Sequence, residues 1–476
     1  MTMQLHAQPV FNRKMLAQRI TITAQDCQAQ LISFLAQKGR YITLAVDSWT
    51  NVTHYKVYNV MLLYAGSAYY YRSIENNEMV RDTSAYIKDK LRTVLQELRV
   101  KKVNVIALVT DNESAIKSAK YDLCIEFGMV TVPCAAHTIQ LILKMMIKKA
   151  KIQDSIDCIT TLIESFRSNN TLRSALMNDQ TQSGCTTILE MIQPNKTRWY
   201  SLHNAFERVM KLKIHIDNVA RNHADIDGIH FDEEKWKCVY DIHKMLNIIH
   251  TCTNRLQSDD ATLNDMYMSV YNIMIESRKW QTSVNKIGIF ESQVMSSQNW
   301  EDIVFDAIKV QWEKHQINGN AIMLAHGLSG GQHRDGYIDS IRSSYDSRID
   351  LLCNMYRKSC VHDSDDTVQL SDEEVKIYIK QQYNNQTMNK PEWGNISDNE
   401  PAVNYYTARL GDDATSILAA AAIAVLSIVP SEASVERSFS AQKDVHRQVR
   451  NCLSGEHVES EMMIRMNSMK LFGYKK

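Results

Sequence analysis

The sequence predicts an α/β core joined to a large helical domain. Apolar runs rich in Val, Ile, Leu and Tyr dominate the first third of the chain, whereas amphipathic helical patterns fill most of residues 150 to 410. The length is a third observation, because 476 residues are too many for one compact hydrophobic core. We therefore expect two or three domains, or one domain that carries a large insertion.

The first 150 residues predict a mixed sheet with helices. Turn sequences such as TNVTH and GS separate three apolar runs, so these runs should form a three-strand meander. The run VNVIALVT is almost uninterrupted, which is typical of a strand buried on both faces. The expected elements are strands at 42–46, 57–64 and 67–75, a helix at 83–100, a strand at 103–110, a helix at 113–120, a strand at 129–134 and a helix from His137. This β-β-β-α-β-α-β order matches a ribonuclease-H-like mixed sheet.

Shifts in composition suggest the domain boundaries. We expect a helical lead-in over residues 1–40, the first part of the core over 41–150 and a helical insertion over 151–404. Polar sequences such as DSDDT and QQYNNQ predict a linker near 361–404, at the end of the insertion. Helical patterning returns over 405–476. The fold class is thus α/β plus α, with a sheet interrupted by a large helical insertion domain.

Composition excludes several classes of protein. Lys and Arg number 54, as do Asp and Glu, so no global positive field indicates nucleic acid, and any such surface must be local. The ten Cys residues include no Cys-x-x-Cys pair, which favours reduced thiols in the cytosol or nucleus. The N-terminus has no apolar signal segment, and the apolar run at 417–429 is too short to span a bilayer. That run predicts a buried helix.

Two carboxylates follow expected central strands. Asp47 comes after the apolar part of YITLAVDSWT, and Asp111 follows VNVIALVT. On neighbouring strands they would suit Mg²⁺ or Mn²⁺, since these cations prefer oxygen ligands and support phosphoryl displacement. The alternative is that each Asp is an ordinary turn or helix-capping residue. The sequence pattern by itself offers no third acid.

A Cys-x-x-His motif lies at a predicted strand-to-helix junction. Cys134 and His137 in CAAHTIQLIL lack the two further ligands that a structural zinc site needs. A buried, hydrogen-bonded Cys and His pair is therefore the favoured interpretation.

Two further segments are candidates for contact with nucleic acid. Arg198 and Trp199 in NKTRWYSLH could hold a phosphate and stack on an unpaired base, although Trp199 could equally pack between helices. Lys148 and Lys149 in KMMIKKAK offer a face for the phosphate backbone, or simply a solvated helix face.

The ordered set of these motifs resembles the hAT superfamily of DNA transposases. The sequences DSWTN, VTDNESAIKSA, CAAHTIQLI and TRWYS occur in that order, and SIVPSEASVERSFSAQKDVHRQVRNCLS follows near the C-terminus. The first half resembles the DUF659-type members, and the tail resembles the hAT C-terminal dimerisation region. The resemblance covers roughly residues 40–220 and 405–470, and the middle of the chain shares only helical character.

The resemblance implies a ribonuclease-H-like catalytic domain with an acidic triad that binds Mg²⁺ or Mn²⁺. Asp47 and Asp111 match its two Asp residues, and Glu436 in SVERSFS matches its Glu, which a helix after the insertion would return to the cleft. The last 72 residues, 405–476, would then complete the catalytic core.

The family also implies roles for the remaining motifs. Cys134 and His137 would support the active site or position DNA. Arg198 and Trp199 would bind distorted DNA near the cleavage site. The expected function is metal-dependent cleavage and transfer of DNA strands in the nucleus, on transposon ends, by a homo-oligomer that is at least a dimer.

Two features depart from the family pattern. Only Cys27 and His6 lie upstream of Asp47, so the paired Cys and His of a BED-type zinc finger are missing there. The aromatic pair often found before the dimerisation motif is replaced by Tyr405 and Tyr406. The alternative function is therefore a non-catalytic, domesticated or truncated hAT-derived protein that binds DNA and dimerises. A helical scaffold unrelated to DNA is a more distant alternative.

The C-terminal region also holds the surfaces expected to associate. An apolar stripe there is either a core face or a dimer face, and together with the run at 417–429 it is expected to contribute to self-association. The stripe consists of Val458, Met462, Met466 and Met469.

Overall fold

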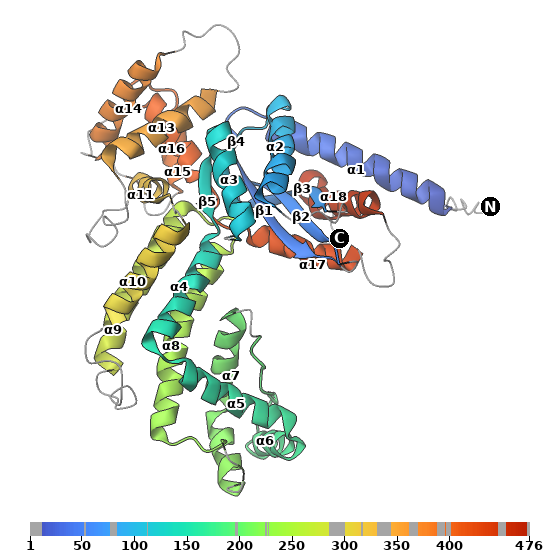
Figure 1. Ribbon diagram of the computed structural model, residues 1–476, viewed down its shortest axis with the longest axis vertical. Coiled ribbons are helices and arrows are strands. Elements are labelled where there is room, and N and C mark those ends of the chain that lie inside the picture. Colours follow the sequence, from blue (N-terminus) through green and yellow to red (C-terminus); the bar gives the residue numbers. More distant parts are fainter. Residues whose placement is uncertain are drawn as a thin grey trace, which may run out of the picture. The chain divides into compact units, whose positions relative to one another are not determined.

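The structure is a computed structural model of the 476-residue chain (Figure 1). It describes residues 12–51, 54–76, 83–111, 113–195, 199–223, 226, 228–284, 300–315, 318–330, 344–360, 370–387, 396, 401–445 and 454–473. The chain forms two compact units. Unit 1 comprises Met1–Ala135, Leu256–Met266 and Ile317–Lys476, and unit 2 comprises Ala136–Arg255 and Tyr267–Gln316.

Unit 1 contains a five-stranded mixed sheet with the strand order β3-β2-β1-β4-β5. β1 pairs antiparallel with β2, and β2 pairs antiparallel with β3, while β4 is parallel to both β1 and β5. The elements are β1 (Ile42–Thr50), β2 (Lys56–Tyr64), β3 (Ser67–Glu75), α2 (Ser84–Val100), β4 (Val105–Thr110), α3 (Ser114–Phe127) and β5 (Val130–Pro133). The predicted order of strands and helices is therefore confirmed.

Two predicted boundaries need correction. The sequence suggests that a strand ends at Asp47, but β1 continues to Thr50 because its ladder with β2 runs on to the pair Thr50↔Lys56. The helix predicted at 113–120 extends as α3 to Phe127. It ends there because Gly128 adopts the left-handed conformation, with φ of 62°, and its N–H caps the carbonyls of the last turn.

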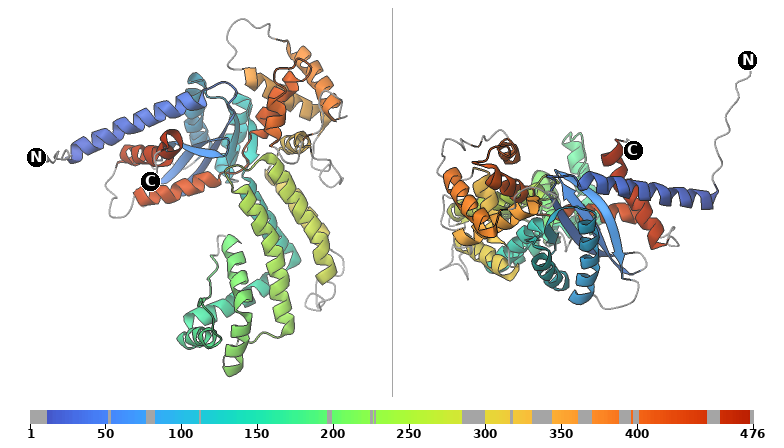
Figure 2. Two further views of the ribbon diagram at one scale, coloured as in Figure 1. Left: turned by 180° about the vertical axis from the view of Figure 1, so that it is seen from behind. Right: turned by 90° about the horizontal axis from the view of Figure 1, so that it is seen from above.

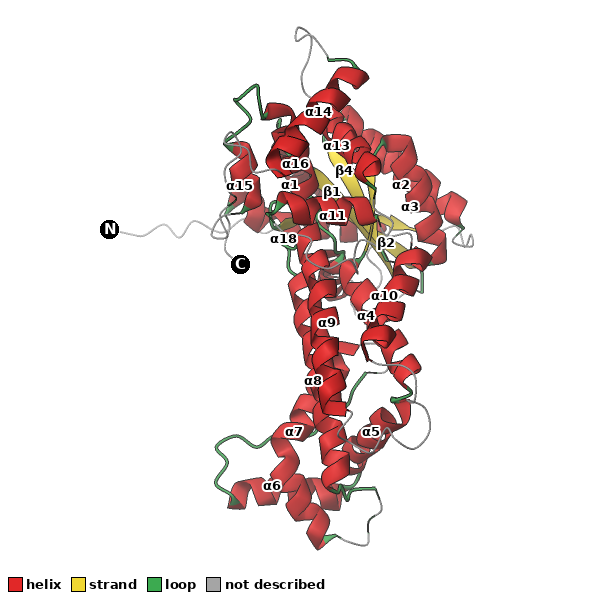
Figure 3. Ribbon diagram, turned by 90° about the vertical axis from the view of Figure 1, so that its left-hand side faces the viewer, coloured by secondary structure: helices red, strands yellow, loops and turns green. Residues whose placement is uncertain are grey.

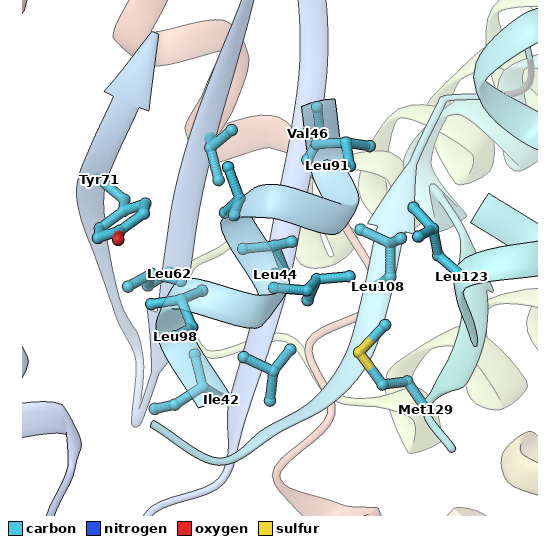
Figure 4. Close-up of a cluster of buried hydrophobic side chains, with 14 of the residues drawn as sticks. Ile42, Leu44, Val46, Leu62, Tyr71, Leu91, Leu98, Leu108, Leu123 and Met129 are labelled. Atoms are coloured by element: carbon cyan, nitrogen blue, oxygen red, sulfur yellow. The ribbon is translucent and has the colours of Figure 1, made fainter. Parts of the chain in front are cut away.

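Alternate residues of β1 face opposite sides of the sheet, as the two-residue period of a strand requires. The side chains of Ile42, Leu44 and Val46 enter a buried cluster with α2 and α3 (Figure 4). This cluster includes Leu62, Tyr71, Leu91, Leu98, Leu108, Leu123 and Met129. It fixes the register of β1, because a slip by one residue would turn this apolar set away from the core.

The C-terminal segment covers the other face of β1. Val429 donates its N–H to Oγ1 of Thr43 at 3.1 Å. Further along the strand, Trp49 donates its indole N–H to Oε1 of Gln442 at 3.2 Å, and its ring lies 5.9 Å from that of Phe439. Gln442 and Phe439 belong to α17 (Ala433–Val445). The chain from Val429 to Gln442 therefore follows β1 from Thr43 to Trp49.

Two helices from opposite ends of the sequence pack together in unit 1. α1 (Arg13–Leu35) contacts α18 (Gly455–Phe472), as Figure 2 shows, and α18 also contacts β3. Asn467 of α18 is fully buried, and its amide bonds both the N–H and the carbonyl of Tyr70, at 2.9 and 2.7 Å.

The apolar C-terminal stripe divides between core and surface. Val458 and Met462 are buried within unit 1, so they are core residues, whereas Met469 is 49% exposed. The run at 417–429 lies mostly in α16 (Ser416–Leu426), and nearly every side chain of that helix is buried. The predicted buried helix is therefore confirmed. Because α16 is covered within the unit, it has little apolar surface left for self-association.

Helices from the predicted insertion surround α16 in unit 1. They are α11 (Gly319–Leu328), α13 (Tyr345–Ser359), α14 (Asp372–Thr387) and α15 (Ala402–Thr407), and each contacts α16. The compact units thus divide the chain at places other than the predicted boundaries of 151 and 404, because these helices bury their apolar faces against α16.

The regular elements described in unit 2 are all helices (Figure 3). They are most of α4 (Ala135–Ala150), α5 (Gln153–Ser168), α6 (Asn170–Gln182), α7 (Trp199–Asn222), nearly all of α8 (Glu233–Leu256), most of α9 (Leu263–Val284) and α10 (Trp300–His315). None of the helices described in the chain is long and apolar enough to cross a membrane.

Candidate active site

Asp47 lies on the face of the sheet that α17 covers. In the β1–β2 ladder it pairs with Asn59, and opposed residues of an antiparallel pair point to the same face. Asn59 is fully buried, and its amide N–H groups donate to Oγ of Ser438 and Oε1 of Gln442, each at 2.9 Å. Because these acceptors belong to α17, the Asp47 side chain faces the same helix.

Asp111 reaches the same end of the sheet. β1 and β4 are parallel with Val46 opposite Thr110, so Asp47 of β1 and Asp111, which directly follows β4, are the next residues along the two adjacent chains. The Asp111 carboxylate accepts a hydrogen bond from the N–H of Glu113 at 3.2 Å. The capping interpretation of Asp111 predicts a local hydrogen bond of this kind. The Asp111 carboxylate nevertheless stays close enough to Asp47 to act on it electrostatically.

Glu436 lies in the first turn of α17 and is exposed. Its position follows from the contacts of α17 with Asn59 and Trp49. The charges of both Asp111 and Glu436 act on Asp47, so the three acids suggested by the sequence lie in one neighbourhood, although Glu436 is 325 residues beyond Asp111 (436 − 111).

A fourth acid, Glu432, was missed by the sequence reasoning. It immediately precedes α17, and its side chain is 3% exposed. Its Oε2 atom has no hydrogen-bond partner among the described residues. The only sequence signal was a Glu among small residues in PSEASVER, four positions before Glu436, and nothing in that pattern marks it as buried.

The electrostatics of the site reflect burial and crowding of like charges. Burial raises the pKa of Asp47 to about 7, and the nearby carboxylates of Asp111 and Glu436 add to the shift, against a hydrogen bond from the N–H of Ser48. Burial raises the pKa of Glu432 to about 8, with Asp47 as the next largest cause, while a hydrogen bond from the Cys134 thiol opposes the shift. The two acids therefore hold protons more tightly than ordinary carboxylic acids.

The donor set suits a divalent cation in its chemistry. Four carboxylates supply hard oxygen ligands, and the unpartnered Oε2 of Glu432 is a buried acceptor that a cation could satisfy. Within the described residues, however, no three His, Cys, Asp or Glu side chains are placed together so as to hold a metal ion. As placed, the four carboxylates therefore do not form a metal site.

Cys134 holds the segment that leads into α17. It is buried, and its Sγ atom lies 3.9 Å from Oγ of Ser431. The neighbouring N–H of Ala135 donates to the carbonyl of Pro430 at 2.7 Å. His137 is half-buried and falls in unit 2. Because Cys134 is buried and hydrogen-bonded, the structure agrees with the favoured interpretation for that residue.

The residues predicted to contact DNA lie in unit 2 or outside the described residues. Arg198 is outside them, and Trp199 begins α7 without a described side chain. Lys148 is exposed in the last turn of α4, whereas Nζ of Lys149 lies 2.7 Å from the carboxylate of Asp306. Lys149 is therefore partly neutralised, and Lys148 is the more available for a phosphate.

By fold and site this is an α/β protein with an acidic cluster at the carboxyl end of two central parallel strands. The family model described as "Domain of unknown function (DUF659)" matches residues 11–168, and the one described as "hAT family C-terminal dimerisation region" matches residues 403–468. The chain belongs to the hAT family of transposases.

The similarity of the chain to solved structures is low. Among solved structures, the chain is similar to the "Drosophila P element transposase strand transfer complex", at 12% identity and a TM-score of 0.31, over 98% of this chain and 95% of that one. No curated protein matches the chain.

Proposed function

We propose that the protein is a metal-dependent DNA transposase with a ribonuclease-H-like core. The observation that carries this proposal is the convergence of Asp47, Asp111 and Glu436 on one end of the sheet, supplied by two strands and a distant helix. Membership of the hAT family supports a DNA substrate and self-association through residues 403–468. Such a protein would act in the nucleus.

The three acids have separate tasks in this proposal. Asp47 within β1 and Asp111 directly after β4 would hold Mg²⁺ or Mn²⁺, and Glu436 would approach from α17. A bound divalent cation activates water and stabilises charge at a scissile phosphodiester. Trp49 and Asn59 keep α17 against the sheet, so they position Glu436 without touching the substrate.

Unit 2 would contribute the contacts with DNA. Arg198 and Trp199 would hold a distorted strand, and Lys148 and Lys149 would contact phosphates, with Lys149 first having to leave Asp306.

The test is cleavage of a pre-nicked or branched DNA by the purified full chain with Mn²⁺. We expect Asp47→Ala and Glu436→Ala each to lower the rate by roughly a thousandfold or more, since each removes a ligand of the cation. Asp89→Ala, an exposed Asp of α2, is the matched control and should cleave at the wild-type rate.

A second candidate function is DNA binding and dimerisation without catalysis. It is favoured by the absence, among the described residues, of three side chains assembled around a metal position. Failure of the wild type to cleave, together with DNA affinity that falls steeply with salt, would support it over the transposase proposal.

A further inference from the structure

Three side chains of unit 2 form a connected group that the proposed function does not use. Cys185, His215 and Asp179 all lie within residues 136–255. The Sγ atom of Cys185 lies 3.7 Å from Nε2 of His215, and Nδ1 of the same ring lies 2.7 Å from Oδ2 of Asp179. The thiol and the carboxylate therefore contact opposite nitrogens of one imidazole.

The carboxylate fixes the state of the imidazole ring. An ionised carboxylate can only accept a hydrogen bond, so the hydrogen of neutral His215 is on Nδ1, which faces Asp179. Nε2 then keeps its lone pair and can accept the proton of the Cys185 thiol. A nucleophile beside a base, with the base oriented by a third group, is the arrangement that activates Ser and Cys in acyl-transfer enzymes.

Asp179 and His215 are held where two helices pack together. Asp179 belongs to α6 and His215 to α7, and the two helices contact each other. The amide of Asn218, three residues further along α7, donates to both carboxylate oxygens of Asp179, at 3.3 and 3.2 Å. The side chains of His215 and Asp179 are 13% and 23% exposed, so water has limited access to them. The base and its orienting group are therefore pre-organised.

Cys185 is exposed, and the loop that carries it is held by one buried side chain. Gln180 is 1% exposed, and its amide bonds the N–H and the carbonyl of Leu189, at 2.8 and 3.0 Å. The N–H of Cys185 donates to the backbone carbonyl of Gln180 at 3.0 Å. Between them the chain turns through Gly184, whose φ of 76° favours glycine. Cys185 is thus open to a reagent and yet fixed beside His215.

The group is not placed to bind a metal ion. In the part of the chain that the structure describes, no three His, Cys, Asp or Glu side chains could hold one. Cys185 and Asp179 contact different nitrogens of the ring, so they lie on opposite sides of it and cannot share an ion with it. The chemistry open to the group is that of a thiol beside a base.

We propose that Cys185 is a reactive nucleophile that exchanges with small disulfides and is thereby reversibly modified. Nε2 of His215 takes the thiol proton, and Sγ of Cys185 attacks one sulfur of the disulfide. The new S–S bond forms as that of the reagent breaks, and the released thiolate takes the proton from His215. One protein thiol and one disulfide thus give one mixed disulfide and one free thiol.

Disulfide exchange suits the exposure of Cys185. A small reagent can reach the exposed sulfur directly, and exchange, unlike acyl transfer, needs no donors for an oxyanion. The proposal is independent of the proposed function, because it involves neither a cation nor DNA.

The competing explanation is that His215 and Asp179 serve only to join α6 to α7. It predicts that Cys185 reacts like any exposed thiol. The chain offers a matched comparison in Cys158 of α5, which is also exposed and whose thiol has no His partner among the described residues. The two explanations therefore differ in the reactivity of Cys185 relative to Cys158.

The experiment measures the reaction of the reduced full chain with the aromatic disulfide DTNB at neutral pH, through the absorbance of the released thiol. Mass spectrometry of peptides, without reductant, assigns each rate to its Cys, and oxidised glutathione replaces DTNB in a second series. We expect Cys185 to react roughly tenfold faster than Cys158, or more. His215→Gln keeps a donor for Asp179 but is not a base, so it should slow Cys185 to about the rate of Cys158. Asp179→Asn should slow Cys185 by a smaller factor.

The rate of Cys158 should be the same in all these proteins, and thermal unfolding checks the fold of each variant. Equal rates for Cys185 and Cys158 in the wild type would overturn the proposal. So would an unchanged rate of Cys185 in His215→Gln. Should His215→Gln not fold, Asp179→Asn carries the test, and a rate of Cys185 equal to that in the wild type would again overturn the proposal.

Discussion

Ionisable groups are buried at both ends of the central sheet, but their hydrogen bonding differs between the two ends. At the carboxyl end of β1 and β4, Glu432 has an oxygen with no hydrogen-bond partner in the described residues. At the opposite end of β4 and β5, Nζ of Lys358 donates to the carbonyl of Phe127 at 2.7 Å and to that of Val105 at 3.4 Å. A cavity of about 350 Å³ adjoins this lysine.

Burial moves both groups toward neutrality. It lowers the pKa of Lys358 to about 8, with Arg99 adding to the shift, and it raises the pKa of Glu432 to about 8. The shifted pKa therefore does not distinguish the two ends. Hydrogen bonding does, because Lys358 donates to two backbone carbonyls, whereas Oε2 of Glu432 has no hydrogen-bond partner among the described residues.

The largest expected difference is in how stability depends on pH. Glu432 has a folded pKa of about 8 against an ordinary 4.5, so the folded state keeps a proton that the unfolded state releases. That contribution is complete below pH 4.5 and is lost as pH rises through 8. In EDTA, we expect the free energy of unfolding to fall between pH 5 and 8, by as much as about 1.4 kcal/mol per pH unit for the one proton.

Urea denaturation of wild type and Glu432→Gln across that range measures the effect. The variant should have a shallower slope, and what remains should come mainly from Asp47, whose pKa is also raised. Lys358 titrates in another window. Its folded pKa lies below its ordinary 10.5, so its contribution is complete above pH 10.5 and is lost as pH falls through about 8. Equal slopes for the two proteins between pH 5 and 8 would contradict the assignment to Glu432.

The next largest effect concerns the attachment of α17 at the acidic end. Asn59→Leu removes two donors to α17 and an acceptor for Oγ of Ser73, all in a fully buried position. We expect a loss of about 3 kcal/mol in the free energy of unfolding, because buried partners are left unsatisfied. Chemical denaturation checks it, and a change below about 1 kcal/mol would show that α17 is held mainly by other contacts.

A smaller effect is expected at the basic end. Lys358→Met keeps much of the side-chain volume but leaves the carbonyl of Phe127 without its donor. The free energy of unfolding should fall by about 2 kcal/mol. The Mn²⁺ affinity should stay at the wild-type value, since the substitution is at the far end of the sheet. A weakened Mn²⁺ affinity would break the distinction between a structural end and a ligand-binding end.

The smallest expected change in the free energy of unfolding comes from substituting an exposed acid near the site. Glu113 lies 2.9 Å from Nζ of Lys56 and is 45% exposed. Water screens such pairs, so Glu113→Gln should change the free energy of unfolding by no more than about 0.5 kcal/mol. Thermal or urea denaturation beside Glu432→Gln measures the contrast between an exposed and a buried acid in one neighbourhood.

The local patterns of the sequence predicted the core elements because burial period and turn residues are local signals. The apolar runs became β1 to β5, and the run at 417–429 became the buried helix α16. The residues at which these strands and helices end were less predictable. β1 passes Asp47 because pairing with β2 continues, and that pairing depends on a partner strand rather than on the residue itself.

The roles suggested for Asp47, Asp111 and Glu436 came from ordered motifs, and their convergence required the tertiary structure. Glu432 shows why. Its neighbours in the sequence are small or polar, and nothing among them marks burial. It is enclosed because Val429 and Pro430 bond Thr43 and Ala135, hundreds of residues earlier.

The sequence by itself therefore determined which segments form strands and helices, and to which family the motifs belong. The tertiary structure decided which acids meet and which of them loses contact with water. Helix and strand formation depend on side-chain periods within a few residues, whereas the environment of a carboxylate depends on every segment that packs around it.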